Sequence, residues 1–299
     1  MNRPLIVALA VALTCAACGS DADRSAAHHA PGTPTTAAVA ASERIVSLSP
    51  TATEILFAVG AGKQVVAADD HSDYPASAPT TKLSASDPSV ESIAGYDPDL
   101  VILSADGGGV VAQLRKLHIS AVVEPAARDL DQAYAQIRDL GRRTGHADRA
   151  KEVAHQMETE IHQLVASVPK RAKPLTVFHE LDQTLYSATS KTFIGQVYAD
   201  LGLQNVADAA DPNGDRGGYP QLSAERVVQA NPDVVFLADT KCCGQDASSF
   251  ARRPGFSGLR AVRTHHVVGL DDDIASRWGP RVVDFFRAVV RVLRAIPAT

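Results

Sequence analysis

The sequence is poor in cysteine, and neither charge sign forms a large excess. It has four cysteines, 34 acidic and 29 basic side chains in 299 residues, with no basic block. Nothing in this composition indicates a nucleic-acid partner. Cys242 and Cys243 are adjacent, so they cannot form a disulfide framework that holds distant segments together. We expect either two thiols or one vicinal bridge there.

Sequence motifs of the common hydrolases and nucleotide-binding enzymes are also missing. There is no G-x-S-x-G, no H-E-x-x-H, and the run Gly107–Gly109 lacks the lysine and hydroxyl residue of a phosphate-binding loop. The sequence therefore predicts a protein that is not an enzyme. A tethered hydrolase using His179 and Glu180 as its acid–base pair is the alternative. Direct Zn²⁺ or Mn²⁺ binding would need the same two residues together with His71 and Asp73.

No apolar run is long enough to span a bilayer in the mature chain, and the run Leu5–Leu13 is typical of a secretory signal. It ends in Cys-Ala-Ala-Cys-Gly, which resembles a bacterial lipobox with Cys18 as the lipidated residue. We expect residues 1–17 to be a signal peptide and residues 18–42 to be a disordered, lipid-anchored tether. The protein would then be exported and anchored on the outer face of the cytoplasmic membrane.

From residue 43 the chain alternates short β-branched runs with helical patterns, which predicts parallel sheets covered by helices. Residues 43–129 form one predicted α/β lobe and residues 169–299 a second. Between them, apolar residues recur every three or four positions through residues 130–168, which indicates one long helix. The predicted fold is α/β, with two Rossmann-like lobes joined by a single long α-helix.

One pattern occurs once in each lobe. VESIAGYDPDLVI from Val90 and AERVVQANPDVVF from Ala224 align without a gap on Glu91 and Glu225. The apolar stripe has the same phase in both copies, so both glutamates point away from their cores. They either stabilise the starts of two helices, or present two carboxylates to a partner with paired cationic pockets.

Ligands of parallel α/β sheets bind at the carboxyl ends of the strands. Polar and aromatic residues that follow predicted strands are therefore candidate binding residues. The main candidates are His71, Asp73, Tyr74, Tyr219, Arg277 and Trp278, and the others are Ser49, Pro50, Asp106, Phe178, His179 and Glu180. Trp278, the only tryptophan, could instead be a core residue.

The chain from Arg44 onward resembles the bacterial substrate-binding proteins of iron-chelate and cobalamin importers. The resemblance is carried by RIVSLSPTATEILFAVG at Arg44, HSDYP at His71, YPQLSAERV at Tyr219, SRWGPR at Ser276 and the two Glu-to-Pro-Asp copies. Cobalamin-binding members of the family are the most similar. The resemblance implies two lobes that grip a ligand between them.

The resemblance also implies the function and the partners. The protein would capture a metal chelate, first a corrinoid such as cobalamin and alternatively an iron siderophore or haem, and deliver it to the permease of an ABC importer. Tyr74, Tyr219 and Trp278 would contact the ligand, while Glu91 and Glu225 would dock into permease arginines. We expect a monomer without a resident cofactor.

Overall fold

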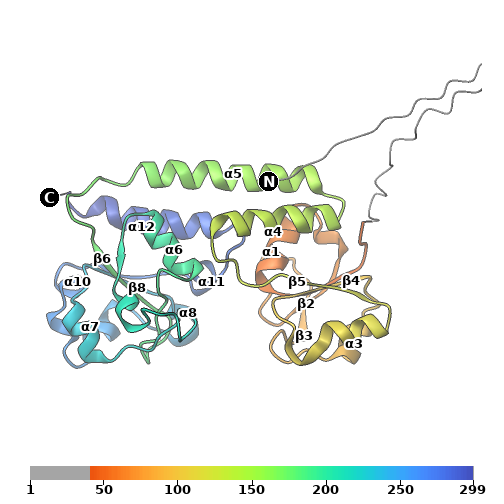
Figure 1. Cartoon of the computed structure of the whole chain (residues 1–299), viewed down its shortest axis with the longest axis horizontal. Helices are drawn as coiled ribbons and strands as arrows, with labels where there is room; N and C mark the ends of the chain where they lie inside the picture. The colour runs from red at the N-terminus through yellow and green to blue at the C-terminus, as the bar shows by residue number, and fades with distance from the viewer. Residues whose placement is uncertain (1–40, 299) are drawn as a thin grey trace, which may run out of the picture. The chain divides into compact units, whose positions relative to one another are not determined.

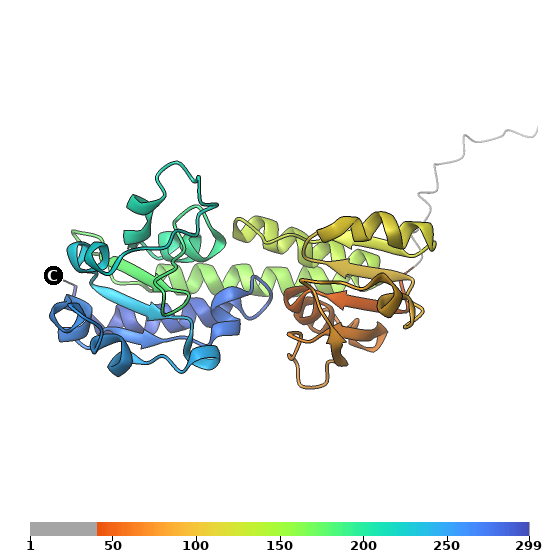
Figure 2. The ribbon, with the colours of Figure 1, turned by 90° about the horizontal axis from the view of Figure 1, so that it is seen from below.

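The computed structural model describes residues 41–298. Figures 1 and 2 show two α/β lobes that lie beneath a pair of helices. The predicted signal peptide, the lipobox with Cys18 and most of the tether lie outside the described residues. No helix among residues 41–298 is both long and apolar enough to cross a membrane.

Lobe one contains a parallel sheet with strand order β3-β2-β1-β4-β5. Its strands are β1 (Ile45–Leu48), β2 (Val65–Asp69), β3 (Thr80–Leu83), β4 (Leu100–Leu103) and β5 (Ser120–Val123). Its helices are α1 (Pro50–Ala58), α2 (Val90–Ala94) and α3 (Val110–Lys116), with 3₁₀ turns η1 (Gly62–Gln64) and η2 (Gly107–Gly109). The strand order reverses between β1 and β4, and such a reversal opens a crevice at the carboxyl ends of the strands.

Lobe two has a parallel sheet with order β7-β6-β8-β9. Its strands are β6 (Thr176–Glu180), β7 (Gln204–Asn205), β8 (Val234–Leu237) and β9 (Val267–Gly269). Its helices are α6 (Phe193–Asp200), α7 (Ala224–Ala230), α8 (Thr240–Cys243), α9 (Ala247–Ala251), α10 (Arg260–Arg263), α11 (Asp272–Ser276) and α12 (Val282–Ala295), with 3₁₀ turns η3 (Val206–Ala210) and η4 (Phe256–Gly258). The prediction of two lobes with parallel sheets is confirmed.

The prediction of a single helix across residues 130–168 is wrong. The segment forms two helices, α4 (Leu130–Arg143) and α5 (Ala147–Ala166). The break comes at Gly145, whose φ of +78° is the left-handed conformation that ends helices. Beside it, the Leu140 carbonyl accepts the Thr144 backbone N–H at 3.1 Å and the Thr144 hydroxyl at 2.8 Å, which closes the last turn of α4. Glycine as a helix stop is visible in the sequence, but the apolar periodicity that continues across it hid the break.

α4 and α5 pack closely against each other, and α5 also packs on α12 of lobe two. Close packing depends on Gly141, because a Cβ atom there would lie 2.2 Å from the Cβ of Ala150. α4 in turn contacts α1 of lobe one. The two lobes are therefore connected through a helical hairpin that packs on both of them.

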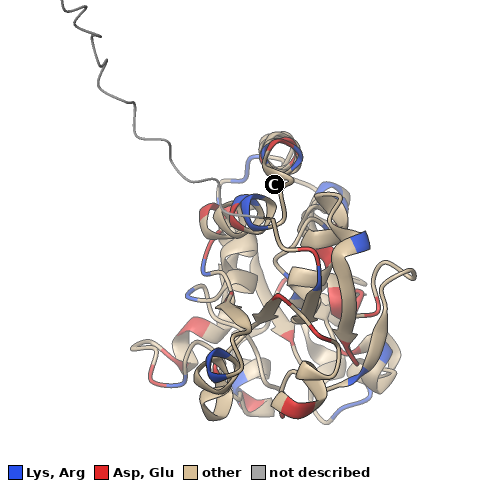
Figure 3. Cartoon of the chain, turned by 90° about the vertical axis from the view of Figure 1, so that its right-hand side faces the viewer, with Lys and Arg blue, Asp and Glu red and all other residues tan. Residues whose placement is uncertain are grey.

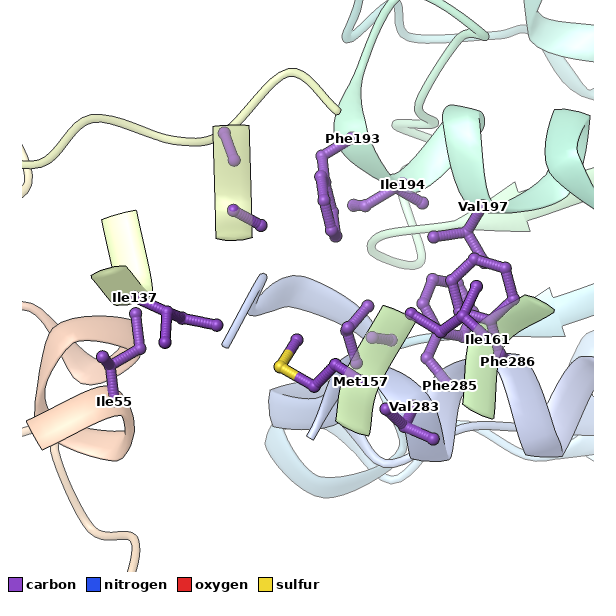
Figure 4. Packing of buried hydrophobic residues seen from close by; sticks show 14 of the residues in the cluster. Ile55, Ile137, Met157, Ile161, Phe193, Ile194, Val197, Val283, Phe285 and Phe286 are labelled. Atoms are coloured by element: carbon purple, nitrogen blue, oxygen red, sulfur yellow. The ribbon is translucent and has the colours of Figure 1, made fainter. Parts of the chain in front are cut away.

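A single hydrophobic cluster runs from lobe one through this hairpin into lobe two. Figure 4 shows Ile55 of α1 facing Ile137 of α4, and then Met157 and Ile161 of α5 near Phe286 of α12. All five side chains are at least 95% buried. Burial of apolar area on this scale is the main favourable term that holds the lobes together.

The repeated Pro-Asp motif has a structural role that is the same in both lobes. Asp99, just before β4, accepts a 2.8 Å hydrogen bond from the Glu43 backbone N–H, next to the start of β1. Asp233, just before β8, accepts a 2.8 Å bond from the Thr176 N–H at the start of β6. Each aspartate ties the amino ends of two neighbouring central strands together. This explains the second half of the repeat without any ligand or partner.

Candidate functional site

The lobes meet at a buried cluster of charges. Glu54 of α1 in lobe one is 3% exposed. Its Oε1 accepts a 2.8 Å hydrogen bond from Arg277 Nη1, and its two oxygens accept bonds of 3.0 and 2.5 Å from Arg281 Nε and Nη2. Both arginines belong to the segment between α11 and α12 of lobe two. Such a pairing costs desolvation of all three groups, and it is tolerated because the bonds are short and charge-assisted.

Arg277 also contacts the loop that follows β2. Its Nη2 donates to the His71 carbonyl at 3.0 Å and lies 3.4 Å from the Asp73 carboxylate. A further bond of 2.7 Å goes to Asp273, one turn earlier on its own element. The structure thus brings together the predicted site residues His71, Asp73 and Arg277. The His71 ring is not part of the cluster, because its side chain is 82% exposed.

Tyr74 lies at the edge of the same cluster. The Arg281 guanidinium stacks over its ring at 4.0 Å, while the residue stays 46% exposed. Tyr74, Glu54 and Arg281 line an open cavity of about 440 Å³, together with residues of α5 and of the start of α12.

Trp278 is partly buried and packs as the core alternative expected. Its indole N–H donates a 2.7 Å hydrogen bond to the Gln136 Oε1 on α4, and its ring packs against the hydrophobic cluster shared by the lobes. Gln136 is oriented by its own bond to the Pro125 carbonyl. Trp278 therefore helps to join lobe two to α4, and it does not line the 440 Å³ cavity.

Two exposed tyrosines lie close together on lobe two. Tyr219, a predicted site residue, is 41% exposed, and Tyr186 is 42% exposed. Tyr186 pairs with Gln221 in an isolated antiparallel bridge, so Tyr219 lies diagonally across that bridge from it. The sequence reasoning missed Tyr186. The signal was present, because Tyr186 follows β6 by six residues, in a loop at the carboxyl end of the sheet.

Phe178, His179 and Glu180 do not line a cleft, so this part of the prediction is wrong. All three belong to β6 and are fully buried. Their side chains point into lobe two because a parallel strand covered on both faces has no exposed side. His179 Nδ1 lies 2.7 Å from the Tyr198 hydroxyl, and burial lowers the pKa of its imidazole to about 3.

Glu180 is part of a buried acidic pair. Arg253 donates two 2.6 Å hydrogen bonds to the Glu180 carboxylate, while both carboxylate oxygens of neighbouring Asp239 are buried without a hydrogen-bond partner. Burial raises the pKa of Glu180 to about 7, Arg253 opposes this, and Asp239 adds to it. Burial likewise raises the pKa of Asp239. Burial therefore favours the protonated form of both acids.

The acidic residues and histidines do not converge into a metal site. Within residues 41–298, no three His, Cys, Asp or Glu side chains are close enough together to hold a metal ion. The alternatives of Zn²⁺ or Mn²⁺ binding and of a hydrolase both used His179 and Glu180. Neither gains support, because both side chains are inside lobe two and away from His71 and Asp73.

Cys242 and Cys243 are bonded to each other, which is one of the two expected outcomes. They end α8, a short exposed helix held to α11 by the Asp272 carboxylate. That carboxylate accepts hydrogen bonds of 2.8 to 3.1 Å from three successive backbone N–H groups, starting at Thr240. α8 and the segment that carries Arg277 are therefore linked.

Glu91 and Glu225 are both exposed in the first turn of a short helix. The helices are capped by the hydroxyls of Ser89 and Ser223, which accept from backbone N–H groups at 3.2 and 3.3 Å. Hydrogen bonding to its own backbone N–H and to Ser223 lowers the pKa of Glu225, so this exposed carboxylate also takes part in the helix start. Acidic and basic segments are interspersed over the end of the molecule shown in Figure 3.

Two α/β lobes with ligand-facing loops at the carboxyl ends of their strands, held by a helical hairpin, define a class of extracytoplasmic ligand-binding proteins. A family model described as "Periplasmic binding protein" matches residues 45–274. The chain belongs to this family. Its members bind ligands and are not enzymes.

Three similar proteins have printed names that bear on the ligand and the location. A "Cobalamin-binding protein" of Halobacterium salinarum is 31% identical over 94% of this chain and 80% of its own length. An "Uncharacterized ABC transporter substrate-binding lipoprotein YvrC" of Bacillus subtilis is 27% identical over 81% of this chain and 77% of its own. The solved "Periplasmic heme-binding protein RhuT" of Roseiflexus sp. RS-1 is 27% identical with a TM-score of 0.72, covering 85% and 98% of the two chains.

The Glu180 pair predicts a stability that depends on pH. The pKa of Glu180 is 4.5 in the unfolded chain and about 7 in the folded protein. Between these two pH values the folded state therefore binds a proton that the unfolded state releases. This contribution is fully present below pH 4.5 and is lost as the pH rises through about 7. We expect the urea midpoint to fall between about pH 5 and about pH 8, and to fall less in Glu180→Gln.

The urea midpoint of Glu180→Gln should still decrease to some extent as the pH rises. Glu124 causes this remaining decrease, because burial next to Asp139 also raises its pKa to about 7. Glu152→Gln is the control, since its side chain is 63% exposed and pairs only with Arg149 at the surface. If the urea midpoint decreased equally with pH in the wild type and in Glu180→Gln, Glu180 would not be the group responsible.

Proposed function

We propose that this protein is the substrate-binding component of an ABC importer and that it captures a corrinoid such as cobalamin outside the cytoplasmic membrane. The observation that carries the choice of ligand is the charge pairing at the lobe junction. Arg277 and Arg281 are already bound by Glu54, Asp73 and Asp273. An anionic chelate such as haem would have to compete with these carboxylates for each guanidinium.

A corrinoid fits the remaining surface better. Its periphery carries neutral amide arms, and these can hydrogen-bond to carboxylates and carbonyls without requiring a free cation. The exposed rings of Tyr74, Tyr186 and Tyr219 offer apolar faces and hydroxyl groups to a flat macrocycle. The cobalamin-binding relative from Halobacterium supports the same choice, and the heme-binding neighbour supports the alternative.

The first test is calorimetric titration of the purified protein with cobalamin, cobinamide, haem and ferric siderophores. We expect corrinoids to bind and the anionic iron chelates to bind far more weakly. Tyr186→Ala and Tyr219→Ala should each weaken corrinoid binding by about 2- to 10-fold, the value of one aromatic contact.

Leu117→Ala is the matched control, because Leu117 is a large apolar residue with 51% exposure at the end of α3. It should leave the affinity unchanged. Tight binding of haem or a siderophore in place of corrinoids would replace this proposal with the alternative in the same family.

Delivery to a permease is the second part of the proposal, with Glu91 and Glu225 as the docking residues. Both are exposed, each lies in a corresponding place in its lobe, and neither contacts the lobe junction. The double variant Glu91→Lys/Glu225→Lys should abolish uptake by cells, because its ammonium groups would face permease arginines, while the affinity for the ligand is unchanged.

The control reverses two other exposed charges, Asp148→Lys/Glu152→Lys on α5. Uptake should continue in that variant. Loss of affinity in the Glu91/Glu225 variant, or equal loss of uptake in the control, would remove the docking role.

Attachment to the membrane through Cys18 is the third part. It is supported by the lipobox-like sequence and by the lipoprotein relative YvrC. We expect Cys18→Ala to move the protein from the membrane fraction to the soluble fraction of cells, measured by immunoblotting, and Cys15→Ala to leave it in the membrane fraction. Membrane attachment that persists in Cys18→Ala would refute the anchor.

A further inference from the structure

Glu54 is the buried carboxylate of the charge cluster. Its side chain is 1% exposed, whereas those of Asp73 and Asp273 are 63% and 24% exposed. It comes from α1, while both arginines that it binds lie 223 and 227 residues further along the chain. No other carboxylate in the cluster contacts both arginines.

The N–H donors of Arg277 and Arg281 are largely occupied by Glu54 and by its neighbours in the cluster. Arg277 uses Nη1 for Glu54 and Nη2 for Asp273 and the His71 carbonyl. Arg281 uses Nε and Nη2 for Glu54, which is the edge that a ligand carboxylate would bind in a bidentate manner. Glu54 thus occupies the place that an anionic ligand group would take.

That place can be reached from outside. The 440 Å³ cavity is lined by Glu54, Arg281 and the half-exposed Tyr74, so a side arm of a bound ligand can enter it and approach the Arg281 guanidinium. A neutral arm can bind there without displacing any group. An anionic arm meets the Glu54 carboxylate and is repelled.

We propose that Glu54 determines the charge selectivity of this binding protein: by binding Arg277 and Arg281 across the lobe junction, it prevents them from binding anionic chelates. The inference rests on the proposed function, since it concerns the ligand captured between the lobes. It adds a residue that makes no direct contact with the preferred ligand and acts through the two arginines.

The test measures two affinities in each variant, one for cyanocobalamin and one for haemin, whose two propionates make it an anionic probe. Glu54→Gln keeps the size of the side chain and removes its charge. We expect haemin to bind this variant roughly 10- to 100-fold more tightly than the wild type, as charge-assisted bonds to freed guanidinium groups should give. The affinity for cyanocobalamin should change much less.

Asp139→Asn is the matched control. Asp139 also pairs with two arginines, Arg142 and Arg143, but on α4 and away from the cavity. It changes the net charge by the same amount and should not alter haemin binding. In the double variant Glu54→Gln/Arg281→Gln the gain should disappear, which shows that it depends on the freed arginine.

The inference is overturned if Glu54→Gln does not bind haemin more tightly than the wild type. It is also overturned if Asp139→Asn shows an equal increase in affinity for haemin. If Glu54→Gln does not fold, Glu54→Asp decides, because its shorter side chain reaches Nε and Nη2 of Arg281 less closely. A gain there supports the inference and no gain overturns it. If the wild type does not bind cyanocobalamin, the proposed function fails, while the haemin comparison still tests Glu54 independently.

Discussion

The apolar cluster beneath α4, α5 and α12 is the constraint on which the rest of the molecule depends. It is continuous from α1 of lobe one to the sheet of lobe two, and it includes residues of both sheets. Because the lobes share one core, their relative position is fixed by packing and not by a flexible linker. Interiors are close-packed, so only small relative movements are compatible with this cluster. The loops at the carboxyl ends of the two sheets are therefore held in a fixed relation to one another.

The charged residues at the lobe junction can exist only because this core positions them. Glu54, Arg277 and Arg281 are drawn from opposite ends of the chain and lose most of their hydration. Such a cluster contributes little net stability compared with apolar residues of similar size. Removing one of its charges is nevertheless destabilising, because the remaining charge stays buried without a partner. The position of each carboxylate also determines which N–H groups of Arg277 and Arg281 are already occupied.

Much of this architecture could be predicted from local pattern. The β-branched runs became strands, and the serines before Glu91 and Glu225 became helix caps. The two glutamates are exposed, while Ile93 and Val227, two positions further along each helix, are buried. The helical periodicity from residue 130 to residue 168 was misleading, because an apolar stripe can continue across a hairpin when both helices face the same core. Gly145 was the sign of the break.

The candidate site was only partly predictable, for a physical reason. Position after a strand identified His71, Asp73, Tyr74 and Arg277, which do come together. It also selected His179 and Glu180, because the exact end of a buried strand cannot be read from composition, and it passed over Tyr186. The sequence by itself determined the parallel α/β lobes, the helix caps and the exposed glutamates, since these depend on neighbours within a few residues. Only the tertiary structure decided that Glu54 binds Arg277 and Arg281, because those groups are more than 220 residues apart and meet only once the two lobes pack on the α4–α5 hairpin.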